Sequence, residues 1–173
     1  MASSIGNGAL TARPAHPNDA AAMAEIYNQG IEDRVATFET EPRSAADIRR
    51  WFDSAYAIVC VEDAAGEVAG YAVAHPYADR CCYRGIGEFS VYVRRSHRRH
   101  GVGGAAMAGL IEAARQGGLW KLLSRIFPEN HASLALMRRM GFREVGVHEK
   151  HGKLDGVWKD CVIVERLIEE NID

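Results

Sequence analysis

Short apolar runs, bounded by Gly, Pro, Asp and Asn, recur along the chain and predict β-strands. The turn Asp63-Ala64-Ala65-Gly66 joins two of them at a spacing typical of a hairpin with a short loop. The strands are expected at residues 9–13, 57–62, 68–75, 86–93, 120–127, 142–149 and 157–166.

Between these runs the apolar residues recur every three or four positions, which predicts helices. Ser44-x-x-Asp47 resembles a capping box, and Gly117-Gly118 is a typical helix end. The helices are expected from Pro17 to near Gly30, over 44–52, from the glycines at 101–104 to Gly117, and over 128–141.

The order of these elements predicts an α+β (mixed α/β) domain with helices on both faces of a mixed sheet. Strands 86–93 and 120–127 are separated by a helix, so they are expected to be parallel and joined by a right-handed crossover. With 173 residues, 47% of them hydrophobic and 25% charged, the chain has the size and composition of one globular domain. We expect this domain over 10–168, with a leader at 1–9 and a tail at 169–173.

Composition excludes several classes of function. The net charge of −2 disfavours a nucleic-acid-binding protein, and no apolar run of about 18 residues predicts a membrane span. Residues 1–10 lack the features of a signal peptide, which predicts a cytoplasmic location. The four cysteines contain no C-x-x-C pair and are expected to be free thiols. The pairs His97/His100 and His148/His151 lack matching Cys or Glu partners, so we expect no metal site.

A basic, glycine-rich turn follows strand 86–93 and opens the next helix. Unpaired N–H groups at a helix start, glycines that allow close approach and arginine side chains together bind phosphate. The turn fits neither the P-loop nor the dinucleotide fingerprint, and an ordinary basic β–α turn is the alternative. Its residues are Arg98, Arg99, His100, Gly101, Val102, Gly103 and Gly104.

Two motifs in this order resemble a known superfamily. Arg98-x-x-Gly101-x-Gly103 resembles the acetyl-CoA signature of the Gcn5-related N-acetyltransferases (GNAT), and Pro128-Glu129-Asn130-x-x-Ser133 with Met140-Gly141-Phe142 is similar to its second motif. A narrower resemblance is to the phosphinothricin-type N-acetyltransferases, with relatives that detoxify methionine sulfoximine, methionine sulfone or arsinothricin and so confer resistance. It rests on Thr37-Phe38-Glu39-Thr40-Glu41-Pro42, Arg80-x-x-Tyr83-Arg84, Glu88-Phe89-Ser90-Val91-Tyr92-Val93 and Gly152-Lys153-x-x-Gly156-x-Trp158-x-Asp160.

The resemblance implies the GNAT fold, whose sheet splays apart between strands 86–93 and 120–127 with acetyl-CoA as co-substrate in the gap. Backbone groups of Val91 and Val93, with Tyr92 between them, would bind the pantetheine arm. N–H groups of residues 99–104 would hold the pyrophosphate, beside Arg98. Asn130 and Ser133 would contact the cofactor from the next helix, although Asn130 is equally suited to cap that helix.

The resemblance also implies that Glu88 is the catalytic general base. An α-amine with a pKa near 8 is only about one-tenth neutral at pH 7, so a base is useful, and partial burial would raise the pKa of Glu88 toward that range. A backbone N–H near Val91 to Val93 would stabilise the developing oxyanion. Met137 stands where many relatives carry a proton-donating Tyr, so we expect water to protonate the leaving thiolate.

Candidate acceptor contacts follow from what an anionic amino acid needs. Arg80 and Lys153 can supply cations, while Tyr83 and Phe38 can form walls; Arg84 is a weaker candidate. A solvated surface for the charged residues and plain core for Phe38 are the alternatives. The predicted protein is thus a small-molecule amino-acid N-acetyltransferase, and the family resemblance implies a homodimer. A protein or peptide N-acetyltransferase and a non-catalytic acetyl-CoA-binding module are the competing hypotheses.

Overall fold

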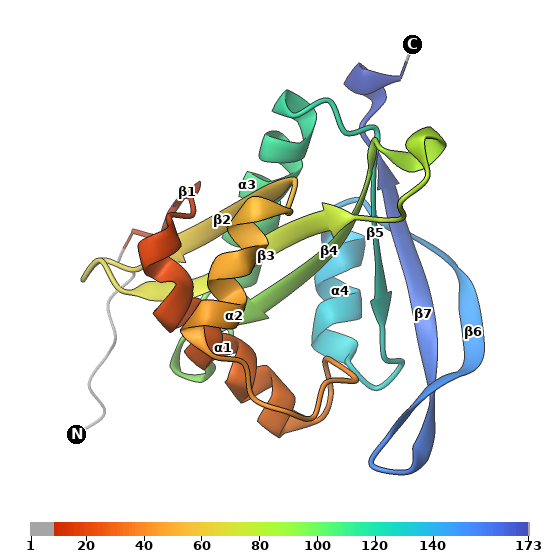
Figure 1. The fold of residues 1–173 in the computed structure, drawn as a ribbon, viewed down its shortest axis with the longest axis horizontal. Helices are drawn as coiled ribbons and strands as arrows, with labels where there is room; N and C mark the ends of the chain where they lie inside the picture. Colours follow the sequence, from red (N-terminus) through yellow and green to blue (C-terminus); the bar gives the residue numbers. More distant parts are fainter. Residues whose placement is uncertain (1–8, 173) are drawn as a thin grey trace.

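Seven strands form one sheet in the computed structural model, which describes residues 9–172 (Figure 1). The predicted leader at 1–9, apart from Ala9, and the last residue of the predicted tail lie outside the described residues. In spatial order the strands are β1 (Thr11–Pro14), β2 (Ala57–Glu62), β3 (Val68–Pro76), β4 (Ile86–Val93), β5 (Lys121–Ile126), β7 (Val157–Leu167) and β6 (Arg143–Leu154).

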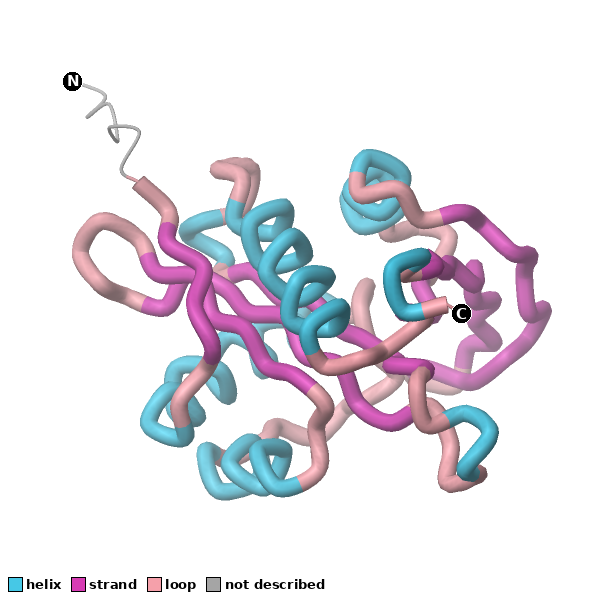
Figure 2. Tube along the Cα trace, turned by 90° about the horizontal axis from the view of Figure 1, so that it is seen from above, coloured by secondary structure: helices cyan, strands magenta, loops and turns pink. Residues whose placement is uncertain are grey.

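Helices cover both faces of this sheet, as the sequence predicts. One core lies between the sheet and α1 (Ala20–Asp33) with α2 (Ala45–Arg49), and a second lies under α3 (Val102–Gln116) and α4 (His131–Arg139) on the opposite face (Figure 2). Short 3₁₀ segments occupy Pro17–Asp19, Arg50–Asp53, Cys81–Tyr83, Arg95–His97 and Glu169–Asn171.

The sheet is antiparallel except where β4 meets β5. These two strands pair in parallel only over Ile86–Glu88 on β4 and Lys121–Leu123 on β5. Beyond them β5 remains paired with β7 and β4 with β3, so the two central strands diverge. The predicted splay is therefore confirmed, and it opens just past Glu88.

The prediction that the first long helix ends near Gly30 is wrong. Helix α1 continues to Asp33 and ends where Arg34 adopts a left-handed conformation with φ of 59°. Gly30 instead allows close packing, because a Cβ there would lie 2.8 Å from Cε1 of Tyr92. The glycine is required by this contact between α1 and β4 and is not a helix stop.

The prediction that the sixth strand ends near residue 149 is also wrong. β6 runs to Leu154 and forms a long hairpin with β7, closed by Asp155 and Gly156, whose φ values of 49° and 80° suit a tight hairpin turn. A register irregularity between His148 and Gly152 interrupts the pairing. The hairpin reaches past the end of the splay, where it contributes to the site described next.

Candidate active site

The open edge of β4 faces the gap between β4 and β5. The N–H of Arg94 donates to the carbonyl of Ala69 on β3 at 2.8 Å, so the alternate residues Phe89, Val91 and Val93 direct their backbone groups toward β5. Pairing with β5 ends at Glu88 and Leu123, so the backbone groups of Val91 and Val93 have no ladder partner on β5 within the described residues. A small cavity of about 50 Å³ lies in the gap, and Val91, Tyr92, Asn130 and Ser133 are among its lining residues.

The glycine-rich turn leads from β4 into α3 with a left-handed backbone. Arg99 and Gly101 have φ of 66° and 84°. The first helical hydrogen bond runs from the N–H of Ala105 to the carbonyl of Gly101 at 3.0 Å, which leaves the N–H groups of residues 102–104 ahead of it unpaired within the helix. This is the arrangement that binds an anion at a helix start.

The two arginines of this turn have different surroundings. Arg98 donates to Oδ2 of Asp33 at the end of α1 at 2.5 Å, and Arg95 donates to the other oxygen at 2.8 Å. Burial would raise the pKa of Asp33, but the hydrogen bonds from Arg95 and Arg98 outweigh burial and lower it. Arg98 is therefore tied to α1, although it is exposed on the turn like Arg99 and His100.

Glu88 lies at the inner end of the splay, half-buried in a cavity of about 420 Å³. Nε of Arg125 on β5 donates to Oε1 of Glu88 at 3.0 Å, and Nη2 of Arg125 donates to the same oxygen. The sequence prediction missed Arg125. The alternation of side chains along strand 120–127 places Arg125 on the same face as Leu123. The missing information was the register, in which Leu123 pairs with Glu88.

Phe38 closes the same cavity from the loop between α1 and α2. Its ring packs edge-on against Phe127 at a centroid distance of 4.8 Å, and it abuts Gly152, where a Cβ would lie 2.7 Å from Cε1 of Phe38. His151 and Gly152 of the hairpin also line the cavity. Phe38 thus belongs both to a small apolar cluster and to the cavity wall.

The other predicted acceptor residues are not among those lining the Glu88 cavity. Arg80 and Tyr83 lie in the β3–β4 loop, with Cζ of Arg80 5.8 Å from the centre of the Tyr83 ring. Lys153 lies on the hairpin, with Nζ 4.7 Å from the Trp158 ring. Their roles remain predictions.

Asn130 of the second motif and Met137 on α4 have clear structural roles. Asn130 caps α4, because its Oδ1 accepts a hydrogen bond from the N–H of Ser133 at 3.2 Å. Met137 is 1% exposed in the core under α4. The position therefore carries no proton donor near the gap, and the capping role of Asn130 leaves its side-chain amide nitrogen for another partner.

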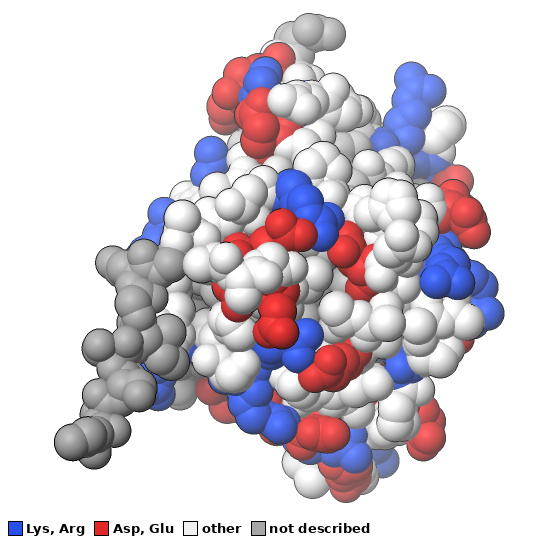
Figure 3. Space-filling view, turned by 90° about the vertical axis from the view of Figure 1, so that its left-hand side faces the viewer, with Lys and Arg blue, Asp and Glu red and all other residues white. Residues whose placement is uncertain are grey.

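The remaining chemistry-bearing residues add little to this site. All four cysteines are free, and burial raises the pKa of the Cys161 thiol that lines the Glu88 cavity, which makes it a weak nucleophile. Among residues 9–172 no three His, Cys, Asp or Glu side chains are grouped to hold a metal ion, and no helix is long and apolar enough to cross a membrane. Acidic and basic side chains are interspersed on the face shown in Figure 3.

Comparison with known proteins gives a consistent result. The sequence profile of the Acetyltransferase (GNAT) family matches residues 23–142. The L-methionine sulfoximine/L-methionine sulfone acetyltransferase of Pseudomonas aeruginosa is 35% identical over 157 residues, which is 88% of this chain and 91% of that protein. The phosphinothricin N-acetyltransferase of Streptomyces coelicolor is 30% identical over 167 residues, covering 93% and 98% of the two chains.

A solved structure has the same fold. The GNAT superfamily phosphinothricin acetyltransferase of Sinorhizobium meliloti, in complex with acetyl-CoA, superimposes with a TM-score of 0.84 and 29% identity. The match covers 91% of this chain and 88% of that one. The gap between β4 and β5 thus occurs in a fold that binds acetyl-CoA in a relative.

Proposed function

The chain belongs to the GNAT family of acetyltransferases, and from that premise we propose that it acetylates the α-amine of a small amino acid or of a toxic analogue. Acetyl-CoA is the proposed donor, and the acceptor class includes phosphinothricin, methionine sulfoximine, methionine sulfone and arsinothricin. The relatives that carry this proposal are N-acetyltransferases named for acceptors of this kind. The protein is accordingly an N-acetyltransferase enzyme.

One observation supports the acceptor class most directly, namely the ion pair between Glu88 and Arg125 in the cavity at the inner end of the splay. A free amino acid is a zwitterion with an ammonium group and a carboxylate two bonds apart. The ammonium group is complementary to Glu88 and the carboxylate to Arg125. The pair is thus preformed for the charged end that all α-amino acids share.

The residues around the gap fit acetyl-CoA, which supplies a thioester whose acetyl group is open to attack by an amine. Val91 and Val93 offer backbone groups to the pantetheine arm, with Tyr92 between them, and the N–H groups of residues 99–104 offer donors to the pyrophosphate. Asn130 can bind the cofactor through its side-chain amide nitrogen, with Ser133 beside it.

Glu88 is the proposed general base. Both hydrogen bonds from Arg125 go to Oε1, so Oε2 can accept the proton of the acceptor ammonium group. An N–H of β4 near Val91 to Val93 would stabilise the negative charge on the carbonyl oxygen. Because Met137 has no proton to give, water is the proposed source of the proton for the thiolate. Transfer is direct from donor to acceptor, since the Cys161 thiol is a weak nucleophile.

The acceptor's other contacts are proposed from sequence and placement. Phe38 forms one wall, while Arg80 and Tyr83 of the β3–β4 loop and Lys153 of the β6–β7 hairpin would bind the anionic side chain if these segments move toward the cavity. A homodimer is also proposed, and the exposed apolar residues Val145, Val147 and Val157 of the β6–β7 hairpin offer a surface for it.

Release of free CoA tests the function. We expect turnover with phosphinothricin, methionine sulfoximine, methionine sulfone or arsinothricin in preference to peptides. Activity on peptides alone would show instead a peptide N-acetyltransferase. Tight acetyl-CoA binding without turnover of any amine would show a binding module.

Gly104→Ala tests the proposed pyrophosphate site separately from folding. A Cβ at Gly104 meets no atom within 4 Å, and Gly-to-Ala changes inside a helix are stabilising by roughly 0.5–1 kcal/mol. We therefore expect an unchanged or higher Tm but weaker acetyl-CoA binding, because the methyl group occupies space beside the N–H groups.

Calorimetric titration with acetyl-CoA and thermal melting measure the two effects. The matched control is Gly146→Ala on β6, where a Cβ also meets nothing within 4 Å and which lies outside the turn. Equal acetyl-CoA Kd values for Gly104→Ala and the native protein would place the pyrophosphate elsewhere.

Arg80→Ala tests the proposed contact with the acceptor side chain. We expect a several-fold higher KM for phosphinothricin, because a charged hydrogen bond is lost, and an unchanged Kd for acetyl-CoA. Arg139→Ala is the matched control, because Arg139 is an exposed arginine at the end of α4 and does not line the cavity. Steady-state kinetics decide the point: an equal loss of affinity for both ligands would indicate a folding defect instead of a lost contact.

A further inference from the structure

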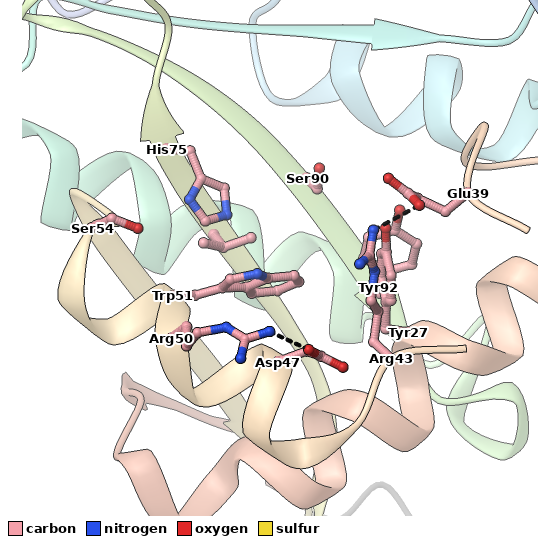
Figure 4. A pocket seen from close by; sticks show the side chains of 11 residues that line it. Tyr27, Glu39, Arg43, Asp47, Arg50, Trp51, Ser54, His75, Ser90 and Tyr92 are labelled. Carbon is pink, nitrogen blue, oxygen red and sulfur yellow. Dashed lines mark hydrogen bonds and ion pairs between the residues drawn. The ribbon is translucent and has the colours of Figure 1, made fainter. Parts of the chain in front are cut away.

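A second cavity, here called the Trp51 cavity, lies between the sheet and the α1–α2 face and has a volume of about 390 Å³ (Figure 4). Of the residues proposed above to bind the cofactor, Tyr92 alone lines the Trp51 cavity. It adjoins the Glu88 cavity, because both share the lining residues Tyr27, Glu39, Ser90 and Tyr92.

The walls of the Trp51 cavity carry balanced charge. Arg43 pairs with Glu39 at 2.7 Å, and Arg50 pairs with Asp47 (Figure 4). Burial lowers the pKa of His75, which favours its neutral imidazole. A ligand with a net charge would find no unmatched partner here, and a neutral one is favoured.

Three aromatic side chains, Tyr27, Trp51 and Tyr92, are among the residues that line the cavity. The Trp51 indole lies between His75 and the Arg50–Asp47 pair in Figure 4. Its centroid is 5.3 Å from that of His75 and 5.7 Å from that of Tyr27, with interplanar angles of 87° and 86°. Such edge-to-face contacts hold the indole in one orientation, which gives a planar ligand a fixed surface to pack on.

The cavity is large enough and close enough to receive an acceptor side chain. A void of about 150 Å³ holds benzene in another protein, so 390 Å³ is ample for an aromatic ring. His75 pairs directly with Glu88 across β3 and β4, and side chains so placed have Cβ atoms about 4.5–5.5 Å apart. Ser90 is two residues from Glu88 and points to the same face of the sheet.

We propose that the Trp51 cavity is a subsite for a neutral aromatic side chain, so that the enzyme also acetylates aromatic amino acids such as L-phenylalanine. The α-amine lies at Glu88 and the ring enters past Ser90 and His75 to pack on Trp51. The inference rests on the proposed function, since the reaction is the same: the amine–acetyl C–N bond forms and the thioester C–S bond breaks. Glu88 takes one proton from the ammonium group, and the second proton that the nitrogen loses reaches the thiolate through water.

Trp51→Leu and Trp51→Phe, assayed with L-phenylalanine and L-methionine sulfone, test the subsite. For Trp51→Leu we expect kcat/KM to fall at least tenfold with L-phenylalanine and less than threefold with L-methionine sulfone. Trp51→Phe restores most of the loss, because it keeps an aromatic surface. The matched control is Phe52→Leu, since Phe52 packs against the same core but does not line the cavity. In Phe52→Leu, the ratio of kcat/KM for L-phenylalanine to kcat/KM for L-methionine sulfone stays at the native value.

Four results would overturn the subsite. If the native enzyme acetylates methionine sulfone but not phenylalanine, the subsite is rejected and the proposed function stands. Equal losses for both acceptors in Trp51→Leu, matched by Phe52→Leu, would mean that Trp51 acts through folding alone. If the native enzyme acetylates neither these amino acids nor phosphinothricin, both the proposed function and the subsite are rejected. Turnover of the dipeptide L-alanyl-L-phenylalanine but not of phenylalanine would place the ring on a second residue and equally reject the amino-acid subsite.

Discussion

Glu88→Gln is expected to lower kcat by roughly 10²–10⁴-fold with little change in the Kd for acetyl-CoA. Glutamine keeps the shape of the side chain but cannot take a proton from the acceptor ammonium group. The reaction then depends on the small neutral fraction of the amine. That fraction grows as the pH approaches the amine pKa of about 8, so the variant should gain more from rising pH than the native enzyme does.

Steady-state kinetics between pH 6.5 and 9, with saturating acceptor, measure this effect. Glu39→Gln is the matched control, because Glu39 lines the same cavity and is not the proposed base. The Glu88 carboxylate is only half-buried, so a general loss of stability is not expected to mimic the result. An unchanged kcat for Glu88→Gln at neutral pH would remove Glu88 from the role of base.

Arg125→Leu is expected to raise the KM for an amino-acid acceptor by about 10–100-fold. A hydrogen bond to a charged group contributes about 1.5–3 kcal/mol, and each 1.4 kcal/mol is a factor of ten. The loss falls on acceptor binding, since Arg125 is the proposed partner of the acceptor carboxylate. Arg125→Lys should recover part of it, because the charge is kept but the planar fork is lost.

The KM for phosphinothricin and for the matching amine without an α-carboxylate separates the possible roles of Arg125. The native enzyme should discriminate between the two compounds, and Arg125→Leu should not. Arg138→Leu is the control, because Arg138 also pairs with a glutamate, Glu144, but does not line the Glu88 cavity. A variant with normal KM and reduced kcat would show that Arg125 acts only by orienting Glu88.

Local signals predicted much of the fold because they depend on neighbours along the chain. Ser44 and Asp47 form the expected capping box, and β2 and β3 form the expected hairpin. The glycines at 101–104 begin α3 after β4, as a phosphate-binding turn requires. Two predicted element ends were wrong. Gly30 does not end α1, because it is needed for close packing against Tyr92. Strand β6 runs on to the turn at Asp155-Gly156, although its apolar pattern is weak.

Contacts between distant residues were not predictable from such signals. Glu88 and Arg125 are 37 positions apart, and Arg98 and Asp33 are 65 apart. Each pair meets because a sheet register or a helix end brings two otherwise unremarkable charged residues together. The Trp51 cavity likewise needs side chains from α1, α2, β3 and β4.

The sequence by itself determined the fold class, because strand and helix periodicity and motif spacing are properties of the linear chain. The family resemblance that those motifs carry implied the splay beside strand 86–93, with Glu88 at its start. The tertiary structure alone decided that Arg125 holds Glu88, that Asp33 holds Arg98, and that Phe38 faces the cavity while Arg80, Tyr83 and Lys153 do not line it. Charge pairing and cavity shape depend on which faces of separate strands and loops meet, and that is settled only when the sheet register and the helix packing are in place.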